Sequence, residues 1–555
     1  MAKQKNNWRR VGVGVLTLAS VATLAACGSK SASQDSNGAI NWAIPTEINT
    51  LDLSKVTDTY SNLAIGNSSS NFLRLDKDGK TRPDLATKVD VSKDGLTYTA
   101  TLRKGLKWSD GSKLTAKDFV YSWQRLVDPK TASQYAYLAV EGHVLNADKI
   151  NEGQEKDLNK LGVKAEGDDK VVITLSSPSP QFIYYLAFTN FMPQKQEVVE
   201  KYGKDYATTS KNTVYSGPYT VEGWNGSNGS NGTFTLKKNK NYWDAKNVKT
   251  KEVRIQTVKK PDTAVQMYKR GELDAANISN TSAIYQANKN NKDVTDVLEA
   301  TTAYMEYNTT GSVKGLDNVK IRRALNLATN RKGVVQAAVD TGSKPAIAFA
   351  PTGLAKTPDG TDLAKYVAPG YEYNKTEAAK LFKEGLAESG LTKLKLTITA
   401  DADAPAAKNS VDYIKSTWEA ALPGLTVEEK FVTFKQRLED SRKQNFDIVV
   451  SLWGGDYPEG STFYGLFKSD SQNNDGKFAN KDYDAAYNKA ISEDAMKPAE
   501  SAKDYKEAEK ILFEQGAYNP LYFRSGKGLQ NPKLKGVIRN TTGLSIDFTH
   551  AYKNN

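Results

Sequence analysis

The chain has 555 residues, too many for one ordinary hydrophobic core, so its length predicts two or three lobes. Hydrophobic residues make up 39 % of the sequence and charged residues 25 %, which is typical of a soluble globular protein. A net charge of +12 is a mild excess over this length, and no run of Lys and Arg is interleaved with aromatic residues. The composition therefore predicts no nucleic-acid partner.

Residues 1–26 are predicted to be a lipoprotein signal peptide. The basic start M-A-K-Q-K-N-N-W-R-R is followed by an apolar stretch, Val11 to Leu24, that is too short to span a bilayer. The sequence L-A-A-C at 24–27 resembles the lipobox of bacterial lipoproteins, and Cys27 is the only cysteine of the chain. We expect Cys27 to carry the lipid, including palmitate, that holds the protein at the membrane.

Residues 27–38 are predicted to form a tether between this lipid anchor and the folded protein. The stretch from Gly28 to Gly38 is polar and has no apolar periodicity. No later segment approaches the 18 consecutive apolar residues of a membrane-spanning helix. The expected location is therefore the extracytoplasmic face of the cell membrane, with the whole fold in water.

The first elements along the chain are a strand and a helix. L-T-Y-T-A-T-L at 96–102 is rich in β-branched and aromatic residues, as strands are. Thr115 and Asp118 have the spacing of a capping box and predict a helix that Asp128-Pro129 ends. A further helix is predicted from Pro261 to about Arg270.

The rest of the chain continues the alternation of strands and helices. The triplet repeat N-G-S-N-G-S-N-G at 225–232 predicts an exposed hairpin loop. Residues 371–389 and 498–515 are expected to be helices, and 394–399 and 446–453 to be strands. The predicted fold class is α/β, with mixed sheets flanked by helices.

Signatures of enzyme active sites are missing from the sequence. His143 and His550 are the only histidines, which argues against a multi-histidine metal site or histidine acid–base catalysis. There is no G-x-S-x-G nucleophile motif, phosphate-binding P-loop or dinucleotide-binding fingerprint. We therefore expect no catalytic residues, no metal, no cofactor and no enzymatic activity.

Several segments together resemble the extracellular solute-binding proteins of family 5, which include the oligopeptide-binding proteins of ABC importers. The longest of them is L-R-K-G-L-K-W-S-D-G-S-K-L-T-A-K-D-F-V-Y-S-W-Q-R-L-V-D-P at 102–129. The others follow in the order of the family: S-G-P-Y at 216–219, K-N-K-N-Y-W-D at 238–244, N-V-K-I-R-R-A-L-N-L-A-T-N-R at 318–331, S-L-W-G-G-D-Y-P-E-G-S-T-F at 451–463 and N-P-L-Y-F-R at 519–524. The resemblance extends from Ile40 to the C-terminus.

The resemblance implies a two-lobed periplasmic-binding-protein-like fold with an extra small domain. Its parts would be the first lobe (39–70, 181–303 and 519–555), the small domain (71–180) and the second lobe (304–518). Strands passing between the lobes would act as hinges. The implied function is to capture oligopeptides between the closing lobes and deliver them, as a monomer, to ABC transporter permease subunits.

Asp456 is the predicted partner of the peptide's free amine. It follows an apolar strand and the flexible Gly454-Gly455, in a loop position where polar groups meet ligands. A charge taken out of water needs a paired charge, and the aspartate at this place in related oligopeptide binders pairs with the peptide amine. The resemblance implies further peptide-binding residues: Trp453, Gly455, Tyr457, Thr57, Thr59, Tyr135, Tyr304 and Tyr522. Thr57 and Thr59 are expected in an early strand, and the last three on the groove walls.

One departure from the family concerns the strand before Trp453. Related oligopeptide binders can carry an arginine there for the peptide carboxylate, whereas D-I-V-V-S-L-W has no basic residue. Either another base fixes this carboxylate, or it is not fixed and longer peptides are accepted. The alternatives to oligopeptide capture are a receptor for one signalling peptide, a binder of dipeptides, nickel or sugars, and a surface hydrolase.

Overall fold

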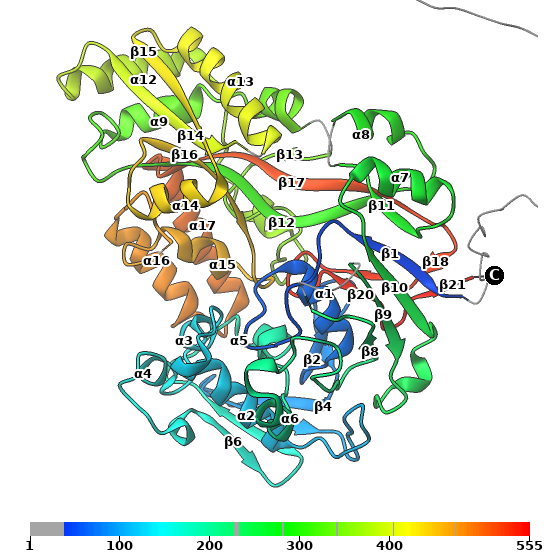
Figure 1. Ribbon diagram of the computed structural model, residues 1–555. Helices are drawn as coiled ribbons and strands as arrows, with labels where there is room; N and C mark the ends of the chain where they lie inside the picture. Colours follow the sequence, from blue (N-terminus) through cyan, green and yellow to red (C-terminus); the bar gives the residue numbers. More distant parts are fainter. Residues whose placement is uncertain are drawn as a thin grey trace, which may run out of the picture. The chain divides into compact units, whose positions relative to one another are not determined.

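The computed structural model describes residues 38–226, 232–279, 282–339, 342–402, 404–471 and 473–554 (Figure 1). The predicted signal peptide, Cys27 and nearly all of the tether lie outside the described residues, as does most of the triplet repeat. Among the described residues, no helix is both long and apolar enough to cross a membrane. We keep the names first lobe, small domain and second lobe for the segments defined above.

The first lobe is built on a sheet with strand order β1-β10-β9-β8, in which β1 and β10 are parallel and the other pairs antiparallel. Its strands are β1 (Ile40–Ile44), β8 (Tyr219–Glu222), β9 (Thr233–Lys238) and β10 (Glu252–Thr257). The alternate residues Ile40, Trp42 and Ile44 face the core. The triplet repeat lies between the antiparallel strands β8 and β9, as a hairpin loop would.

Helix α1 (Thr59–Ser68) packs beside this sheet. It begins after Asp58, whose side chain accepts the backbone N–H groups of Tyr60 and Ser61 at 3.1 and 2.8 Å. The strand expected around Thr57 and Thr59 is therefore wrong. Thr57 lies in a loop and Thr59 is the first residue of the helix, because aspartate at the N-cap satisfies the free N–H groups of the first turn.

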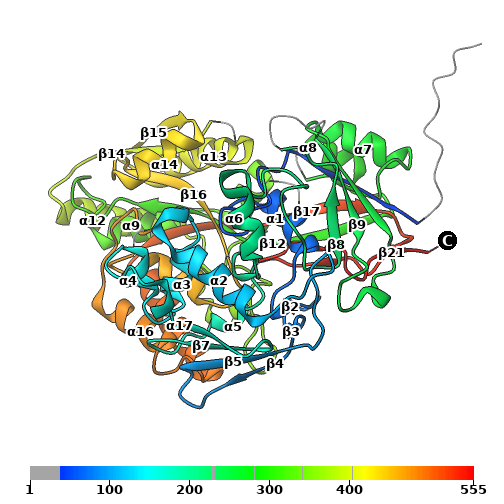
Figure 2. The ribbon, with the colours of Figure 1, turned by 60° about the horizontal axis from the view of Figure 1, so that its bottom comes forward.

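The small domain has a sheet of order β4-β5-β7-β6 (Figure 2). Its elements are β4 (Ala86–Val91), β5 (Thr97–Leu102), β6 (Val163–Glu166), β7 (Lys170–Thr174), α2 (Ala116–Val127), α3 (Tyr137–Glu141) and α4 (Ala147–Asn151). The capping box of Thr115 and Asp118 is confirmed, and so is the end of α2 before Asp128. The domain's core also takes in α5 (Phe182–Tyr185), since Trp123 contacts Phe182.

A larger sheet, shared by the two lobes, has strand order β11-β17-β12-β16-β14-β15, and β13 pairs with β17. The strands are β11 (Ala275–Asn277), β12 (Val294–Tyr307), β13 (Lys344–Pro345), β14 (Leu394–Asp401), β15 (Leu425–Val432), β16 (Ile448–Gly454) and β17 (Tyr518–Gln530). β14 runs parallel to both β15 and β16. Strands β14 and β16 overlap the expected strand segments, each with slightly different ends.

Helices cover both faces of this sheet through separate apolar clusters. On one face lie α9 (Val319–Leu327), α12 (Lys375–Glu388) and α13 (Pro405–Ala421). On the other lie α11 (Leu363–Val367), α15 (Ser461–Tyr464), α16 (Lys481–Ile491) and α17 (Pro498–Glu514). The predicted helix at 371–389 begins only at Lys375, because Asn374 caps it through the N–H of Glu377.

Smaller elements complete the two lobes. They are α6 (Gln196–Tyr202), α7 (Pro261–Lys269), α8 (Ser282–Asn288), α10 (Arg331–Val334), α14 (Phe434–Arg442), β2 (Leu73–Leu75), β3 (Thr81–Pro83), β18 (Leu534–Lys535), β19 (Ile538–Arg539), β20 (Ile546–Asp547) and β21 (Tyr552–Lys553). Helix α7 confirms the predicted helix that starts at Pro261.

Strands β12 and β17 connect the two lobes. They pair from Val294 opposite Leu529 to Glu306 opposite Tyr518, with a register shift after Leu298. At one end β17 pairs with β11, whose Ala276 packs in a cluster with α7 and α8 (Figure 1). At the other end β12 pairs with β16 of the second lobe. Two paired strands that cross between lobes can absorb a closing motion in a few backbone angles.

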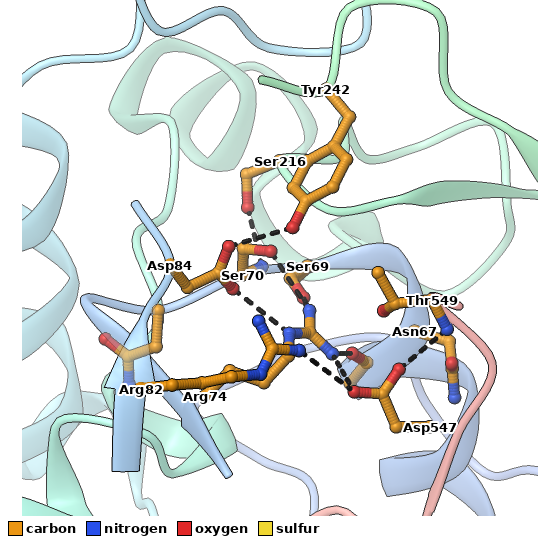
Figure 3. Close-up of polar contacts among 12 residues, drawn as sticks. Asn67, Ser69, Ser70, Arg74, Arg82, Asp84, Ser216, Tyr242, Asp547 and Thr549 are labelled. Carbon is orange, nitrogen blue, oxygen red and sulfur yellow. Dashed lines mark hydrogen bonds and ion pairs between the residues drawn. The ribbon is translucent and has the colours of Figure 1, made fainter. Parts of the chain in front are cut away.

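A buried ion-pair cluster ties the segments of the first lobe and small domain together (Figure 3). Arg74 lies 3.1 Å from Asp84 (Nε to Oδ2) and 3.2 Å from Asp547 (Nη1 to Oδ2), and all three side chains are buried. Arg74 also donates to the carbonyls of Gly66 and Ser69. The C-terminal segment is thereby fixed to α1 and β2, which lie more than 460 residues earlier in the chain.

Candidate functional site

The loop after β16 places Asp456 at the carboxyl end of that strand. The N–H of Gly455 donates to the carbonyl of Ala300 at 2.7 Å, and the N–H of Asp456 donates to Thr462 Oγ1 at 3.0 Å. Ala300 belongs to β12, so the loop is attached to one of the two connecting strands. The carboxyl ends of strands in an open α/β sheet are a common place for ligand sites.

The carboxyl group of Asp456 forms a hydrogen bond with the small domain, although the two lie far apart in the sequence. Tyr137 Oη, at the start of α3, donates to Asp456 Oδ2 at 3.3 Å. Figures 1 and 2 show α3 on the side of the small domain that meets the second-lobe helices α16 and α17. In the described part of the chain Asp456 has no ion-pair partner. A partly buried carboxylate of this kind is suited to a cationic ligand group.

Burial makes Asp456 a weaker acid than an exposed aspartate. Removal from water raises its pKa to about 6, and the hydrogen bond from Tyr137 acts in the opposite direction. Partial desolvation, followed by the negative charge of Asp456, raises the pKa of Glu141, an exposed residue on the same helix as Tyr137, to about 7. Tyr135 also lies near Asp456, and burial followed by this charge raises its pKa to about 12. The site therefore brings two acidic groups together, and each of them holds its proton more readily than an exposed carboxyl group.

Trp453 and Gly455 shape the second-lobe side of the site. Trp453 Nε1 donates to the carbonyl of Thr462 at 2.6 Å, which fixes the indole against the loop. A Cβ atom at Gly455 would lie 3.0 Å from both Leu354 Cδ1 and Phe463 Cε2, so this position has little room for a side chain. Glycine lets the backbone before Asp456 lie close to this apolar cluster.

Tyr457 reaches into the core of the small domain. Its ring lies 5.4 Å from that of Tyr185 in an edge-on arrangement, and its hydroxyl is 3.0 Å from Ser461 Oγ. Edge-to-face pairs of this kind are favourable beyond the area they bury. Tyr457 is therefore a contact between the second lobe and the small domain.

A second contact between these parts lies at the turn between β4 and β5. Gly95 is buried although it stands at a hairpin turn, because Met496 covers it: a Cβ at Gly95 would lie 3.1 Å from Met496 Cγ. Met496 comes from the turn between α16 and α17 and is itself 46 % exposed. Asp494, paired with Lys489 and Lys497 at 2.8 Å, holds this turn in place.

The other predicted residues are spread more widely. Tyr135 is half-buried beside Tyr137 and Phe188, with ring centroids 5.6 and 5.9 Å away. Tyr304 is 3 % exposed and Tyr522 is 4 % exposed, and both belong to apolar clusters of the second lobe. Their burial argues against the expected groove-wall position, because both rings are already surrounded by core side chains. Thr57 and Thr59 are exposed, near the start of α1.

Sequence reasoning missed Tyr137, Glu141 and Tyr185 on the small-domain side of the site. Tyr137 and Glu141 lie one turn apart in the short helix α3, and this i, i+4 spacing was the available signal. This signal is too weak for a prediction, because a helix of five residues is too short to show a repeating pattern. Next to β16 there is a basic residue from another element: Arg437 of α14 donates to Ser451 Oγ at 3.1 Å and pairs with Asp401 at 2.7 Å.

Clusters of His, Cys, Asp and Glu able to hold a metal ion are not found among the described residues. His143 lies at the end of α3, where burial lowers its pKa. The arrangement is that of a two-lobed binding protein, in which paired strands join two lobes and an acidic site lies where the second lobe meets the small domain.

The comparison with known proteins agrees with this class. The family model of the bacterial extracellular solute-binding proteins, family 5 Middle, matches residues 80–475. The chain therefore belongs to the extracellular solute-binding proteins of family 5, which work outside the cytoplasm as transport components.

Relatives match over almost the full chain. The dipeptide-binding protein of Lactococcus lactis subsp. cremoris (strain MG1363) is 43 % identical over 550 residues, covering 98 % of each chain. The oligopeptide-binding protein OppA of Bacillus subtilis (strain 168) is 30 % identical, covering 98 % of this chain and 99 % of its own. The solved structure of Listeria monocytogenes OppA bound to peptide has a TM-score of 0.75 and 32 % identity, covering 94 % of this chain and 99 % of that chain.

Proposed function

We propose that this protein captures peptides between its two lobes outside the cell and delivers them to the permease of an ABC importer. The observation that carries the proposal is Asp456, a partly buried carboxylate that accepts from Tyr137 of the small domain and has no ion-pair partner in the described residues. The names of the relatives support peptides as the ligand class.

The α-ammonium group of a peptide fits this site. Every unmodified peptide carries this group, so a protein that accepts varied sequences can use it as a constant anchor. The α-ammonium group loses its favourable interactions with water when it enters the site, and pairing with a carboxylate compensates for that loss. Strand-like hydrogen bonding to the peptide backbone and hydrated side-chain pockets would supply the rest of the affinity. Arg437 is a basic group that contacts the strand before Asp456, through Ser451.

The same proposal includes the membrane anchor and the oligomeric state of the protein. Cys27 would carry lipid and hold the protein at the outer face of the cell membrane. The protein would act as a monomer without cofactor, metal or nucleic acid, and as a binding protein rather than an enzyme. The proposal keeps the predicted segments for the first lobe (39–70, 181–303 and 519–555), the small domain (71–180) and the second lobe (304–518).

N-acetylation of a peptide is expected to weaken its binding by at least about tenfold, corresponding to about 1.4 kcal/mol, because Asp456 loses its charged partner. In Asp456→Asn the free and acetylated forms should bind about equally. Isothermal titration calorimetry of both peptides against both proteins measures the ratio. Asp412→Asn is the matched control, since Asp412 is exposed on α13. Equal binding of the two forms to the unchanged protein would remove Asp456 from this role.

Met496→Ala is expected to weaken the binding of free and acetylated peptides by the same factor, about threefold, because it removes a contact between the second lobe and the small domain and not a ligand contact. Small-angle X-ray scattering of the peptide-free protein should show a larger radius of gyration for this variant. Val91→Ala, which shortens another exposed apolar side chain, is the control. Unchanged scattering and affinity would mean that the Met496 contact does not influence closure.

A further inference from the structure

Two carboxyl groups, rather than one, stand where the second lobe meets the small domain. Glu141 lies one turn after Tyr137 on α3, on the same helical face, and Tyr137 Oη contacts Asp456 at 3.3 Å. The charge of Asp456 acts on Glu141 strongly enough to contribute to its raised pKa. Glu141, like Asp456, has no ion-pair partner among the residues described. One α-ammonium group would therefore leave one of the two carboxyl groups without a cationic partner.

Buried polar atoms next to Glu141 also lack partners. Tyr185 is 0 % exposed and Gln181 is 5 % exposed, yet neither Tyr185 Oη nor Gln181 Oε1 has a hydrogen-bond partner in the described structure. The Tyr185 hydroxyl lies beside the Gln181 and Tyr457 side chains without reaching hydrogen-bonding geometry, and within range of the charges of Glu141 and Asp456. Buried polar groups are normally paired, so such atoms indicate a missing ligand group or water.

The local backbone holds these groups together. Gln181 Nε2 donates to the backbone carbonyl of Glu141 at 3.3 Å, which leaves Gln181 Oε1 as the unused end of the amide. Gly142 follows α3 directly, and a Cβ there would lie 2.7 Å from Tyr185 Cε2. The absence of a side chain at Gly142 thus lets the ring of Tyr185 approach the end of α3.

We propose that Glu141, Gln181 Oε1 and Tyr185 Oη form a second cation subsite beside Asp456, which accepts the basic side chain of a peptide's first residue. A lysine ammonium group has three N–H donors, and the subsite offers a carboxylate, an amide oxygen and a hydroxyl oxygen as acceptors. The inference rests on the proposed function, since it assumes that Asp456 holds the α-ammonium group.

The test uses four-residue peptides that differ only in their first residue, Xaa-Ala-Ala-Ala, with Xaa as lysine or norleucine. The unchanged protein should bind the lysine peptide about tenfold more tightly, because a charge-assisted contact replaces an apolar one. Glu141→Gln should reduce this ratio to about one, because the lysine peptide loses its carboxylate partner and the norleucine peptide has none to lose at this subsite. Glu152→Gln, an exposed acid after α4, should keep the ratio. Calorimetry gives each dissociation constant.

The outcomes separate this inference from the proposed function. If both peptides bind equally to the unchanged protein, or if Glu141→Gln keeps the preference for lysine, the subsite is wrong while peptide binding stands. If neither peptide binds, the proposed function fails first. Tyr185→Phe supplies a second variant, because it removes Oη and keeps the ring. It should lower the ratio of the two affinities about threefold, because the ammonium group loses one of three acceptors.

Discussion

Asp547→Ala is expected to lower the free energy of unfolding by about 3–5 kcal/mol, because it leaves the buried Arg74 guanidinium without one of its two carboxylates. The charge of Arg74 keeps the pKa of Asp547 below its usual value although burial acts to raise it. The hydrogen bond from the N–H of Thr549 to Asp547, at 2.8 Å, would be lost as well. Urea unfolding followed by circular dichroism measures the change.

The comparison variant is Asp78→Ala. Asp78 pairs with Lys77 at 2.9 Å, but both side chains are largely exposed, and exposed pairs contribute about 0–1 kcal/mol. The two variants therefore remove the same group from a buried and an exposed ion pair. An equal effect of the two substitutions would contradict the structural role given to the Arg74 cluster (Figure 3).

Glu306→Gln is expected to stabilise the protein increasingly as the pH rises from about 5 to 9. Glu306 is buried on β12 and accepts the N–H of Gly476 at 2.6 Å. Burial, with a smaller contribution from Asp475, raises its pKa to about 8, while Lys477 acts to lower it. A glutamine side chain at this position would have the same shape and could still accept from Gly476, but it would never need to ionise.

The direction of this effect follows from the raised pKa. Below pH 4.5 the folded and unfolded states both hold the proton, and the contribution of Glu306 to stability is fully present. It is lost as the pH rises through about 8, by roughly 4–5 kcal/mol at most. Thermal unfolding at pH 6, 7, 8 and 9 should show the two proteins diverging. Glu507→Gln, an exposed acid, is the control, and parallel curves for Glu306→Gln would refute the prediction.

Local signals in the sequence predicted much of the fold. The capping box of Thr115 and Asp118 and the helix beginning at Pro261 need only nearby residues, and both are present in the structure. The same kind of signal is present at Asp58, which caps α1. It explains why a helix begins at Thr59, where a strand was expected. Helix caps act over three residues, so these features are readable from sequence.

The site could be predicted only on its second-lobe side. Asp456 follows a strand and a glycine pair, a pattern that one stretch of sequence contains. Its partner Tyr137 comes from more than 300 residues earlier, and nothing local in Tyr137 or Glu141 indicates that they meet Asp456. Tyr304 and Tyr522 illustrate a second limit. Each lies on a strand, and whether its side chain is buried depends on which face of the sheet it is on. That face is set by the packing of the whole sheet and not by nearby residues.

The route of the chain through the paired strands sets an order in which its parts can be completed during synthesis. The residues between Tyr307 and Tyr518 lie between β12 and β17, so most of the core that they share with β12 can form before β17 has been made. The first lobe cannot be completed this early, because Asp547 and the part of β17 that pairs with β11 are made last. A nascent chain should therefore carry an unfinished first lobe until its final residues have been made.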